Sequence, residues 1–292
     1  MDLSIIIVSW NTKDLLKKCL ESVLAETKGL DFEVFVVDNG SQDGSAKMGE
    51  KNFSQVKLIE NRSNLGFAQA NNQAIEKSRG KYILLLNPDT VILGNTLRKM
   101  IDFLESHPEV GILGPKILNP DGSLQPSCRT FPTLASQALI LLKLHNFLPG
   151  LPPIKKYYML GWDHSETKEV DQVMGSCFMI KKKLIDEIGL LDESYWIWFE
   201  EVDFCKRARL AGWKTYFLPD VSIIHHKAKA FEQLSPIKKQ IRLNRSMLRY
   251  FKKFHSTSSY FALLSLYPSS ILLASLYQVV SKFRPIKKKK YL

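Results

Sequence analysis

Polar residues at the end of one apolar run are the first group in the sequence that could do chemistry. Asn87, Pro88 and Asp89 directly follow Tyr82–Leu86, a run that predicts a buried strand. Packing gives no reason for a carboxylate at the mouth of such a strand. A carboxylate there is well placed to hold a divalent cation, with phosphates completing the ligand shell. The alternative is a simple turn in which Asp89 is an Asx or helix cap.

A second group of acids, Glu200, Glu201 and Asp203, stands at the start of the predicted helix Glu201–Ala211. On a helix, positions 200 and 203 share a face, and position 201 lies about 100° away. Carboxylates beside aromatic side chains are typical of a shaped site with a general base. The alternative is that acids at a helix N-terminus only favour the helix dipole. The neighbouring aromatic residues are Trp196, Trp198 and Phe199.

The elements that must position these groups alternate between strands and helices. Strands are expected at Leu3–Ser9, Phe32–Val37, Val56–Glu60 and Tyr82–Leu86, and helices at about residues 15–24 and 66–78. This alternation predicts an α/β fold with a mostly parallel sheet, in which ligands bind beyond the carboxyl ends of the strands. One crevice should receive the three polar clusters that follow these strands, at residues 10–11, 38–45 and 87–89.

The pattern is looser after about residue 110. A helix is expected near Leu134–His145, strands at Val173–Ile180 and Val221–His226, and a basic helix at Pro236–Phe254.

The first strand–helix turn excludes the usual dinucleotide and phosphate loops. Its sequence is Ser9-Trp10-Asn11-Thr12, where a dinucleotide fold would need G-x-G-x-x-G, and the chain has no P-loop motif. A nucleotide would therefore be held by polar side chains at strand ends. Asp38 could accept hydrogen bonds from a ribose or a base edge; alternatively, Asp38 and its polar neighbours only build a tight loop.

The four cysteines are widely scattered, at positions 19, 128, 177 and 205, with no CxxC pair. This spacing argues against a zinc site or a disulfide framework and favours reduced thiols in a cytosolic compartment. The N-terminal run has no basic segment and no small-residue cleavage site. It predicts a buried strand, and a signal for export is not expected.

The net charge of +12 is concentrated in one part of the chain. Residues 227–292 hold 15 of the 41 Lys and Arg residues but only one acid, Glu232, while residues 1–226 hold 26 basic and 28 acidic residues. A near-neutral body with a basic tail excludes a uniformly basic nucleic-acid binder, and no recognisable nucleic-acid motif is present. The distribution indicates a separate electrostatic attachment region.

The tail combines this charge with an apolar segment. Pro236–Phe254 carries seven Lys and Arg residues, and Phe261–Val280 is largely apolar with basic flanks. Its length is near the minimum for spanning a bilayer, but both basic flanks favour one cytoplasmic side. We expect an interfacial hairpin or a pair of amphipathic helices on anionic lipid. The alternative is a core-packed helix followed by a solvated Lys tail.

Six segments occur in this order along the chain: SIIIVSWN, VVDNGSQDGS, ENRSNLGFAQANN, LLLNPDT, GSCFMIKK and WFEEVDFCKRARLAGW. Together they resemble the family 2 inverting glycosyltransferases of the GT-A fold, which transfer a sugar from a nucleotide diphosphate. The resemblance covers about residues 3 to 255. It implies a Rossmann-like, mixed, mostly parallel sheet sandwiched by helices, with a domain at 1–235 and a basic, apolar helical tail at 236–292. Within the domain, a nucleotide-sugar half is expected at about 1–115 and an acceptor half at about 116–235.

The resemblance also implies the site residues on the donor side. Asp89 matches the metal-binding carboxylate of the family's Asp-x-Asp motif, although Asn87 stands at the first position. His225, with His226 as the alternative, matches a metal-contacting histidine, and the metal is expected to be Mg²⁺ or Mn²⁺. The residues implied to bind the donor are Ser9, Trp10, Asn11, Asp38, Arg62, Asn64, Gly66, Phe67, Asn71 and Asn87.

On the acceptor side, the resemblance gives the role of base to Glu201. The family usually has Glu-Asp-Val-Asp where this chain has Glu200-Glu201-Val202-Asp203, so Asp203 is the second candidate. The residues implied to contact the acceptor are Gly175, Ser176, Trp198 and Glu200.

Residues 122–132 and 242–251 resemble segments of bacterial rhamnosyltransferases in this family. These relatives use dTDP-L-rhamnose and extend a polyprenyl-diphosphate-linked glycan of the cell surface. Donors carrying galactose, glucose or N-acetylglucosamine are alternatives, because the donor sugar varies on this fold. The expected location is the cytoplasmic face of the cell membrane. A different class of function is a catalytically silent module that binds a glycan or a partner enzyme, which Asn87 and Glu201 would support.

Overall fold

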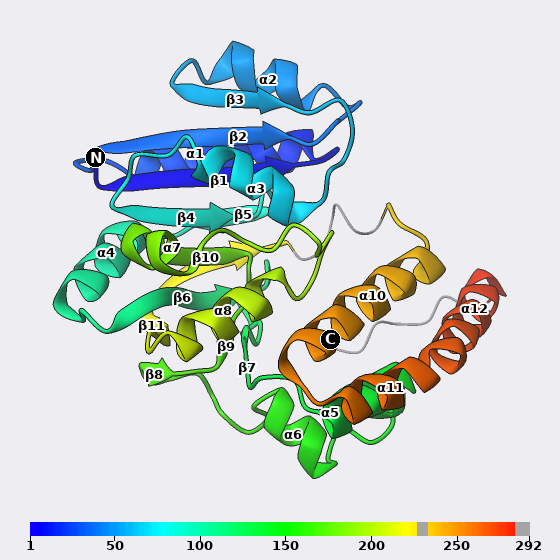
Figure 1. Ribbon diagram of the computed structural model, residues 1–292. Coiled ribbons are helices and arrows are strands. Elements are labelled where there is room, and N and C mark those ends of the chain that lie inside the picture. Colours follow the sequence, from blue (N-terminus) through cyan, green and yellow to red (C-terminus); the bar gives the residue numbers. More distant parts are fainter. Residues whose placement is uncertain (227–232, 284–292) are drawn as a thin grey trace.

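The computed structural model describes residues 1–226 and 233–283. In this part of the chain, one nine-stranded sheet runs through the body in the order β3-β2-β1-β4-β10-β6-β11-β5, and β8 pairs with β11 (Figure 1). A separate two-stranded sheet joins β7 and β9. The strands are β1 (Leu3–Ser9), β2 (Phe32–Asp38), β3 (Val56–Glu60), β4 (Tyr82–Leu86), β5 (Thr90–Ile92), β6 (Val110–Leu118), β7 (Cys128–Arg129), β8 (Lys168–Glu169), β9 (Gln172–Val173), β10 (Cys177–Lys181) and β11 (Lys214–His225).

The main sheet is mixed and mostly parallel, as the sequence predicts. β1 lies parallel between β2 and β4, β3 is parallel to β2, and β11 is parallel to β6. β10 is antiparallel to both of its neighbours, and β5 is antiparallel to β11. The four predicted N-terminal strands therefore form one parallel block, and their carboxyl ends meet at one edge.

Helices cover both faces of the sheet. One face packs against α1, α2 and α4, and the other packs against α3, α7 and α8. The helices are α1 (Lys13–Glu26), α2 (Ser45–Asn52), α3 (Phe67–Ile75), α4 (Thr96–Ser106), α5 (Leu134–Leu141), α6 (Pro152–Tyr157), α7 (Lys182–Ile188), α8 (Glu200–Leu210), α10 (Pro236–Phe254), α11 (Thr257–Ser265) and α12 (Tyr267–Phe283), with a 3₁₀ turn at Leu144–Asn146.

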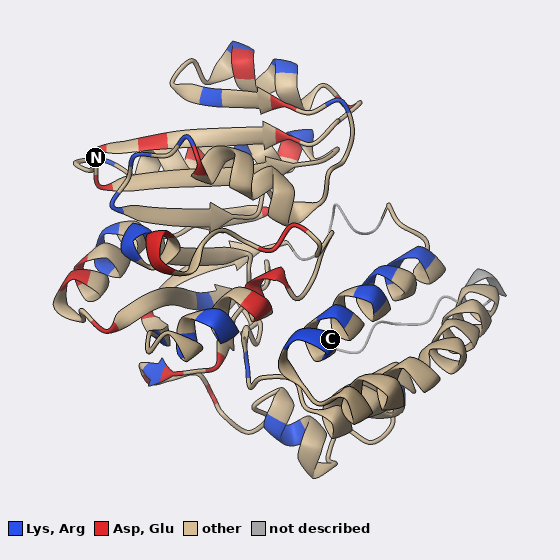
Figure 2. Cartoon of the chain, viewed as in Figure 1, with Lys and Arg blue, Asp and Glu red and all other residues tan. Residues whose placement is uncertain are grey.

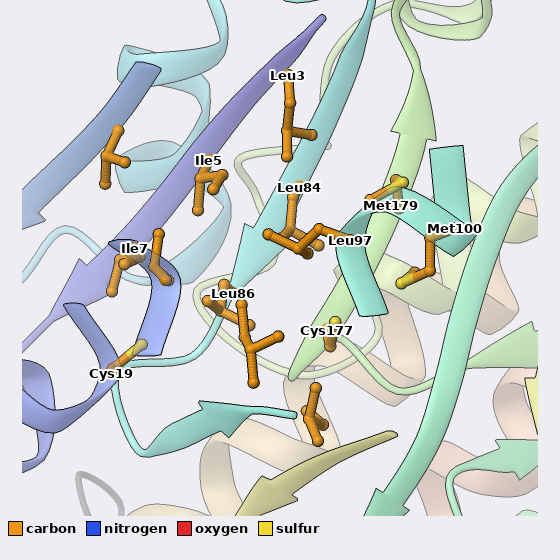
Figure 3. Close-up of a cluster of buried hydrophobic side chains, with 14 of the residues drawn as sticks. Leu3, Ile5, Ile7, Cys19, Leu84, Leu86, Leu97, Met100, Cys177 and Met179 are labelled. Carbon is orange, nitrogen blue, oxygen red and sulfur yellow. The ribbon is translucent and has the colours of Figure 1, made fainter. Parts of the chain in front are cut away.

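The continuous apolar run of β1 follows from this two-sided burial. Ile5 and Ile7 point into the core on one face, whereas Ile6 points into the core on the other. Figure 3 shows the first of these cores, where β1 and β4 side chains meet Cys19, Leu97 and Met100. All four cysteines of the chain are buried free thiols.

Several predicted elements differ from the structure. The expected strand Val173–Ile180 is divided into β9 and β10, because β9 pairs with β7 while β10 pairs with β4 and β6, so the chain changes sheets between them. The strand expected at Val221–His226 is only the end of the longer β11. The helix expected near Leu134–His145 ends at Leu141. The sequence did not predict α2, α4 or β6.

The predicted basic helix Pro236–Phe254 is present as α10, but its inner face belongs to the core. Met247, Tyr250 and Phe251 pack with Tyr195 and Phe199 of the body. The apolar segment that follows is two helices, α11 and α12, which separate at Leu266. α12 lies along α10, and α11 lies beside both α10 and α5 (Figure 1). The first part of the predicted tail therefore supports the body.

Candidate functional site

A cavity of about 300 Å³ lies beyond the carboxyl ends of β1 and β4, between the body and the start of α8. It brings together residues from all parts of the chain between Val8 and His225. Twelve of the residues predicted from the sequence line it: Trp10, Asn64, Gly66, Phe67, Asn87, Asp89, Gly175, Ser176, Trp198, Glu200, Glu201 and His225.

Six predicted site residues do not line this cavity: Ser9, Asn11, Asp38, Arg62, Asn71 and Asp203. Local structure accounts for several of these positions. Ser9 is fully buried and its hydroxyl bonds Thr12 Oγ1 at 3.0 Å. Asn71 donates to the carbonyl oxygen of Phe67, one turn earlier in α3, and Arg62 is exposed. The helical or loop context of these residues directs their side chains away from the cavity.

The loops after β2 and β3 are locked together by Asn39, a residue that the donor prediction did not include. Its side-chain amide donates to Asn64 Oδ1 at 3.1 Å and to the Gly66 carbonyl oxygen at 3.0 Å, and its Oδ1 accepts from the Leu65 amide at 3.1 Å. Gly66 has a φ of +92°, and a Cβ there would collide with the carbonyl oxygen of Trp196. The donor-side wall is therefore a preorganised loop pair.

Asp38 ends β2 beside this wall. Its Oδ1 accepts from the Ser41 amide at 2.8 Å, and its Oδ2 is buried with no hydrogen-bond partner among residues 1–226 and 233–283. A buried carboxylate oxygen without a partner is costly, so the site is suited to a ligand that donates to it, such as a ribose hydroxyl.

Asp89 and His225 face each other at one wall of the cavity. His225 Nε2 lies 3.3 Å from Asp89 Oδ1 and makes no hydrogen bond within the described residues. His225 Nδ1 lies 2.7 Å from Gln125 Oε1, while the Gln125 amide donates to Asn119 Oδ1 at 2.8 Å. Because the Gln125 oxygen only accepts, Nδ1 donates, and Nε2 keeps its lone pair when the ring is neutral. This arrangement fits a divalent cation held by one oxygen and one nitrogen ligand.

His226, the alternative to His225, contributes through its backbone instead. Its amide donates to the carbonyl oxygen of Asp89 at 2.9 Å, which joins the end of β11 to the Asp89 turn. The pairing of β11 with β5 places His225 opposite Thr90 and so brings the imidazole to the Asp89 side chain.

The acids of α8 form the opposite wall. Glu200 and Glu201 both line the cavity, and Oε2 of each is buried without a hydrogen-bond partner in the described chain. Burial raises the pKa of Glu201, and Arg129 opposes part of that rise. Burial, followed by the charge of Glu201, raises the pKa of Glu200 well above its ordinary value. A base in this environment stays protonated to a higher pH than an exposed carboxyl.

The turn that presents these acids is strained. Trp198 has a φ of +58° and Phe199 a φ of +71°, although neither is glycine. α10 holds the turn: Ser246 donates to the Ile197 carbonyl oxygen at 2.8 Å, and the Phe199 and Tyr250 rings lie 5.6 Å apart. The Arg242 guanidinium also lies 3.0 Å from the centre of the Trp196 ring. Such strain persists only where the surrounding structure fixes it.

Asp203, the second candidate for the base, has a different environment. It is fully buried, and its carboxylate accepts from Arg207 Nε at 2.6 Å, Lys253 Nζ at 2.6 Å and Tyr195 OH at 3.2 Å. Its oxygens are therefore occupied by an ion-pair network that joins α8 to α10. The geometry favours Glu201 over Asp203 as the acid that meets a substrate.

Other cavity residues were not among the predicted site residues: Val8, Asn39, Pro88, Gln125, Ser127, Arg129, Gln172, Val173, Met174, Trp196 and Ile197. Gln125, Ser127 and Arg129 lie in the segment 122–132 that resembles rhamnosyltransferases, but no sequence pattern gave them a role. Their position depends on the pairing of β7 with β9, which are more than forty residues apart in the chain.

Comparison with known proteins bears on both family and fold. The family model described as Glycosyl transferase family 2 matches residues 4–189. The N-acetylglucosaminyl-diphospho-decaprenol L-rhamnosyltransferase of Mycobacterium tuberculosis is 29% identical over 237 residues, which are 77% of this chain and 76% of that protein.

Solved structures share the fold at low sequence identity. The mannosyltransferase PcManGT from Pyrobaculum calidifontis, in complex with GDP-Man and Mn²⁺, has a TM-score of 0.57 and 16% identity, over 97% of this chain and 75% of that one. S. aureus TarS 1–349, in complex with UDP-GlcNAc, has a TM-score of 0.54 and 18% identity, over 92% of this chain and 72% of that one.

Proposed function

The chain belongs to glycosyl transferase family 2, and from this premise we propose that its cavity transfers L-rhamnose from dTDP-L-rhamnose to a lipid-linked glycan acceptor. The observation that carries the proposal is the convergence on one cavity of buried polar atoms that have no hydrogen-bond partner in the described chain: Ser176 Oγ, Glu200 Oε2, Glu201 Oε2 and His225 Nε2. Groups of this kind are satisfied by a polar ligand. The name of the rhamnosyltransferase relative supports the choice of sugar and of a lipid-linked acceptor.

Asp89 Oδ1 and His225 Nε2 are the groups that would hold a Mg²⁺ or Mn²⁺ ion. When bound, the ion supplies a positive charge that stabilises the leaving diphosphate. Asn87 stands where a second carboxylate is usual, so the chain's own contribution is one carboxylate and one imidazole, and the donor's phosphate oxygens complete the set. Gln125 fixes the imidazole so that Nε2 faces Asp89.

Glu201 is the base in this proposal. The acceptor hydroxyl attacks the anomeric carbon from the face opposite the diphosphate, its proton passes to Glu201 Oε2, and the bond to the diphosphate breaks. The strained turn before α8 and its supports from α10 hold the carboxylate at the cavity wall. Gly175 is next to Glu201, where a Cβ would be in ordinary contact with the Cβ of Glu201 at 3.8 Å.

The direct test is turnover with a panel of donors. The protein is incubated with dTDP-rhamnose, UDP-glucose, UDP-N-acetylglucosamine or GDP-mannose, with and without Mn²⁺, and with N-acetylglucosamine linked through a diphosphate to a short alkyl chain. We expect dTDP-rhamnose with metal to give the fastest product formation and the largest thermal stabilisation. Faster transfer from a UDP-sugar would make that UDP-sugar the donor in place of dTDP-rhamnose. Nucleotide binding without consumption of any donor would favour a silent binding module.

We also propose that α11 and α12 rest on the anionic membrane that carries the acceptor. Thr257–Val280 is long and apolar enough to cross a membrane, and only a small share of it is buried. Its inner side packs on the body through Leu263, Ser270 and Ala274, which supports lying on the surface rather than spanning. Figure 2 shows residues 257–280, which include no charged residue, beside α10, which is banded with Lys and Arg. Apolar insertion and attraction to anionic lipid would act together.

Substitution of the exposed apolar face should separate membrane binding from catalysis. Leu272, Leu276 and Val279 are each at least half exposed and lie on one side of α12. Replacing all three with Ser is expected to weaken binding to vesicles of phosphatidylcholine and phosphatidylserine by more than about 100-fold, from roughly 1.5 kcal/mol or more per lost apolar side chain. Vesicle flotation measures the effect.

The matched control is Leu210→Ser, which changes an exposed leucine at the end of α8. It should float like the native chain. Truncation before α10 is not a clean test, because α10 supports the turn before α8. Flotation of the triple variant equal to that of the native chain would refute the membrane proposal and leave the transferase proposal standing.

A further inference from the structure

Arg129 is the positive side chain of the cavity. Among the cavity residues that the structure describes, it is the only Lys or Arg. It lies on β7, opposite Gln172 of β9, in the small sheet that is separate from the main one. Its guanidinium carbon lies 5.1 Å from the centre of the Tyr158 ring and 5.8 Å from that of Tyr157.

The surroundings hold this guanidinium firmly. The Thr130 amide donates to the Tyr157 carbonyl oxygen at 3.1 Å, which joins the end of α6 to the strand that carries Arg129. Gln172 Nε2 donates to the Thr130 carbonyl oxygen at 2.8 Å. Both tyrosine rings present faces to the cation, an arrangement that fixes its orientation.

Arg129 forms no ion pair with a carboxylate among residues 1–226 and 233–283. The charge of Glu201 acts on Arg129, which in turn lowers the pKa of Glu201, and the Tyr157 side chain forms a hydrogen bond with the guanidinium. A buried guanidinium has five N–H donors, more than one tyrosine hydroxyl can satisfy, so an anion would gain by binding to it. Its planar set of donors matches phosphate oxygens in a bidentate way. The cavity therefore offers a ready place for a phosphate.

Two phosphate groups could meet this cavity, and the fold separates them. Asp89 follows β4 at the end of the N-terminal block, and β11 brings His225 beside it; this pair suits the donor diphosphate. Arg129 comes instead from β7 and is flanked by α6, in the C-terminal half of the body. α6 packs on α5, and α5 packs on α11, so β7, which is joined to α6 at Thr130, lies toward the apolar helices (Figure 1).

Exposed apolar and basic side chains lie on and next to α6. Phe147 is 78% exposed, and Leu148 beside it is also exposed, immediately before α6. Lys155 and Lys156 of α6 are exposed as well. An acceptor that enters from a membrane on this side would bring its lipid to apolar surface and its phosphates to cationic groups.

We propose that Arg129, held between Tyr157 and Tyr158, binds the diphosphate that joins the acceptor glycan to its lipid. The inference rests on the proposed function and adds a subsite to it. It gives a role to the one cation that β7 brings to the cavity wall among the described residues. It also gives the chain a means to prefer a lipid-linked acceptor over a free glycan with the same sugar.

The test compares two acceptors with one sugar. One is N-acetylglucosamine linked through a diphosphate to a short alkyl chain; the other is the alkyl glycoside without phosphate. In Arg129→Gln, the preference for the diphosphate acceptor, measured as the ratio of the two kcat/KM values, should fall roughly 10- to 100-fold. Arg129→Lys keeps the charge but not the planar fork, and should give an intermediate loss. Arg98→Gln, an exposed arginine on α4, is the matched control.

Two results would overturn the inference. Equal losses with both acceptors would show that Arg129 supports the fold or the base and does not read the phosphate. A loss of nucleotide-sugar affinity in Arg129→Gln, measured by calorimetry, would assign the cation to the donor. If the native protein transfers no sugar at all, the proposed function fails by itself. Calorimetric binding of the alkyl diphosphate to the native chain and to Arg129→Gln then still decides whether Arg129 binds the phosphate.

Discussion

Glu201→Gln is expected to lower kcat by roughly 10²- to 10⁴-fold while the affinity for the nucleotide sugar stays within a few fold. The amide keeps the size and the polar character of the carboxylate but cannot take the proton of the acceptor hydroxyl. Glu201 Oε2 has no hydrogen-bond partner in the described chain, and the amide oxygen of Gln can still accept the backbone hydrogen bonds made to the carboxylate, so the substitution should leave the fold intact. Initial rates at saturating donor and acceptor measure the loss.

The pH profile makes the same prediction sharper. Burial raises the pKa of Glu201, so the protonated, inactive form persists to a higher pH than the ordinary carboxyl value of about 4.3. The rate should rise with pH through this raised pKa, and this rise forms the acidic limb of the pH–rate profile. The profile of Glu201→Gln should lack that limb. Arg129 lowers the pKa of Glu201, so replacing Arg129 with an uncharged residue should move the acidic limb to still higher pH.

Glu200 and Asp203 supply the controls. Glu200→Gln should leave the acidic limb almost in place, because burial and the charge of Glu201 raise the pKa of Glu200 well above its ordinary value and keep Glu200 uncharged while Glu201 ionises. Asp203→Asn leaves Arg207 and Lys253 without their shared buried carboxylate and should destabilise the fold by about 3 kcal/mol or more. A normal rate and acidic limb in Glu201→Gln, with both lost in Asp203→Asn, would exchange the two assignments.

The parallel half of the sheet could be predicted because its strands are buried on both faces. Leu3–Ser9 and Tyr82–Leu86 are continuous apolar runs, a pattern that is typical of strands covered on both faces. β6 lacked this signal because Gly111, Gly114 and Pro115 interrupt it. Gly114 is needed for packing, since a Cβ there would lie 2.7 Å from the Cβ of Val173. At this strand, tertiary packing overrides the low strand propensity of glycine and proline.

The cavity wall could be predicted at Asn87 and Asp89, which follow β4, but not where distant segments aim the side chains; Asp38, at the end of β2, does not line the cavity. Asp89 lies at the mouth of β4, as its sequence position indicates. The helical face of Asp203 could not be oriented from the sequence, because its partner Lys253 is fifty residues away on α10. Arg129 lies in an irregular segment without periodicity, and only the pairing of β7 with β9 turns it into the cavity.

The second large effect is expected at the metal pair. Asp89→Asn should lower the affinity for Mn²⁺ in the presence of the nucleotide sugar by more than about 100-fold, since it removes the one carboxylate of the pair. kcat/KM at a fixed, low Mn²⁺ concentration should fall with it. The measurement is the Mn²⁺ dependence of both the rate and the thermal stabilisation by the donor. His225→Ala should act in the same direction.

Substitutions at Gln125 and Asn87 should change the affinity for Mn²⁺ by a smaller amount and in the opposite direction, respectively. Gln125→Ala removes only the partner that orients His225, so it should weaken Mn²⁺ binding by about 10- to 100-fold, less than Asp89→Asn. Asn87→Asp adds a second carboxylate at the cavity wall and should tighten Mn²⁺ binding. The opposite signs at positions 89 and 87 follow from the ligands' charge. If Asp89→Asn keeps the native Mn²⁺ dependence, the ion is held elsewhere or is not used, whatever happens to the rate.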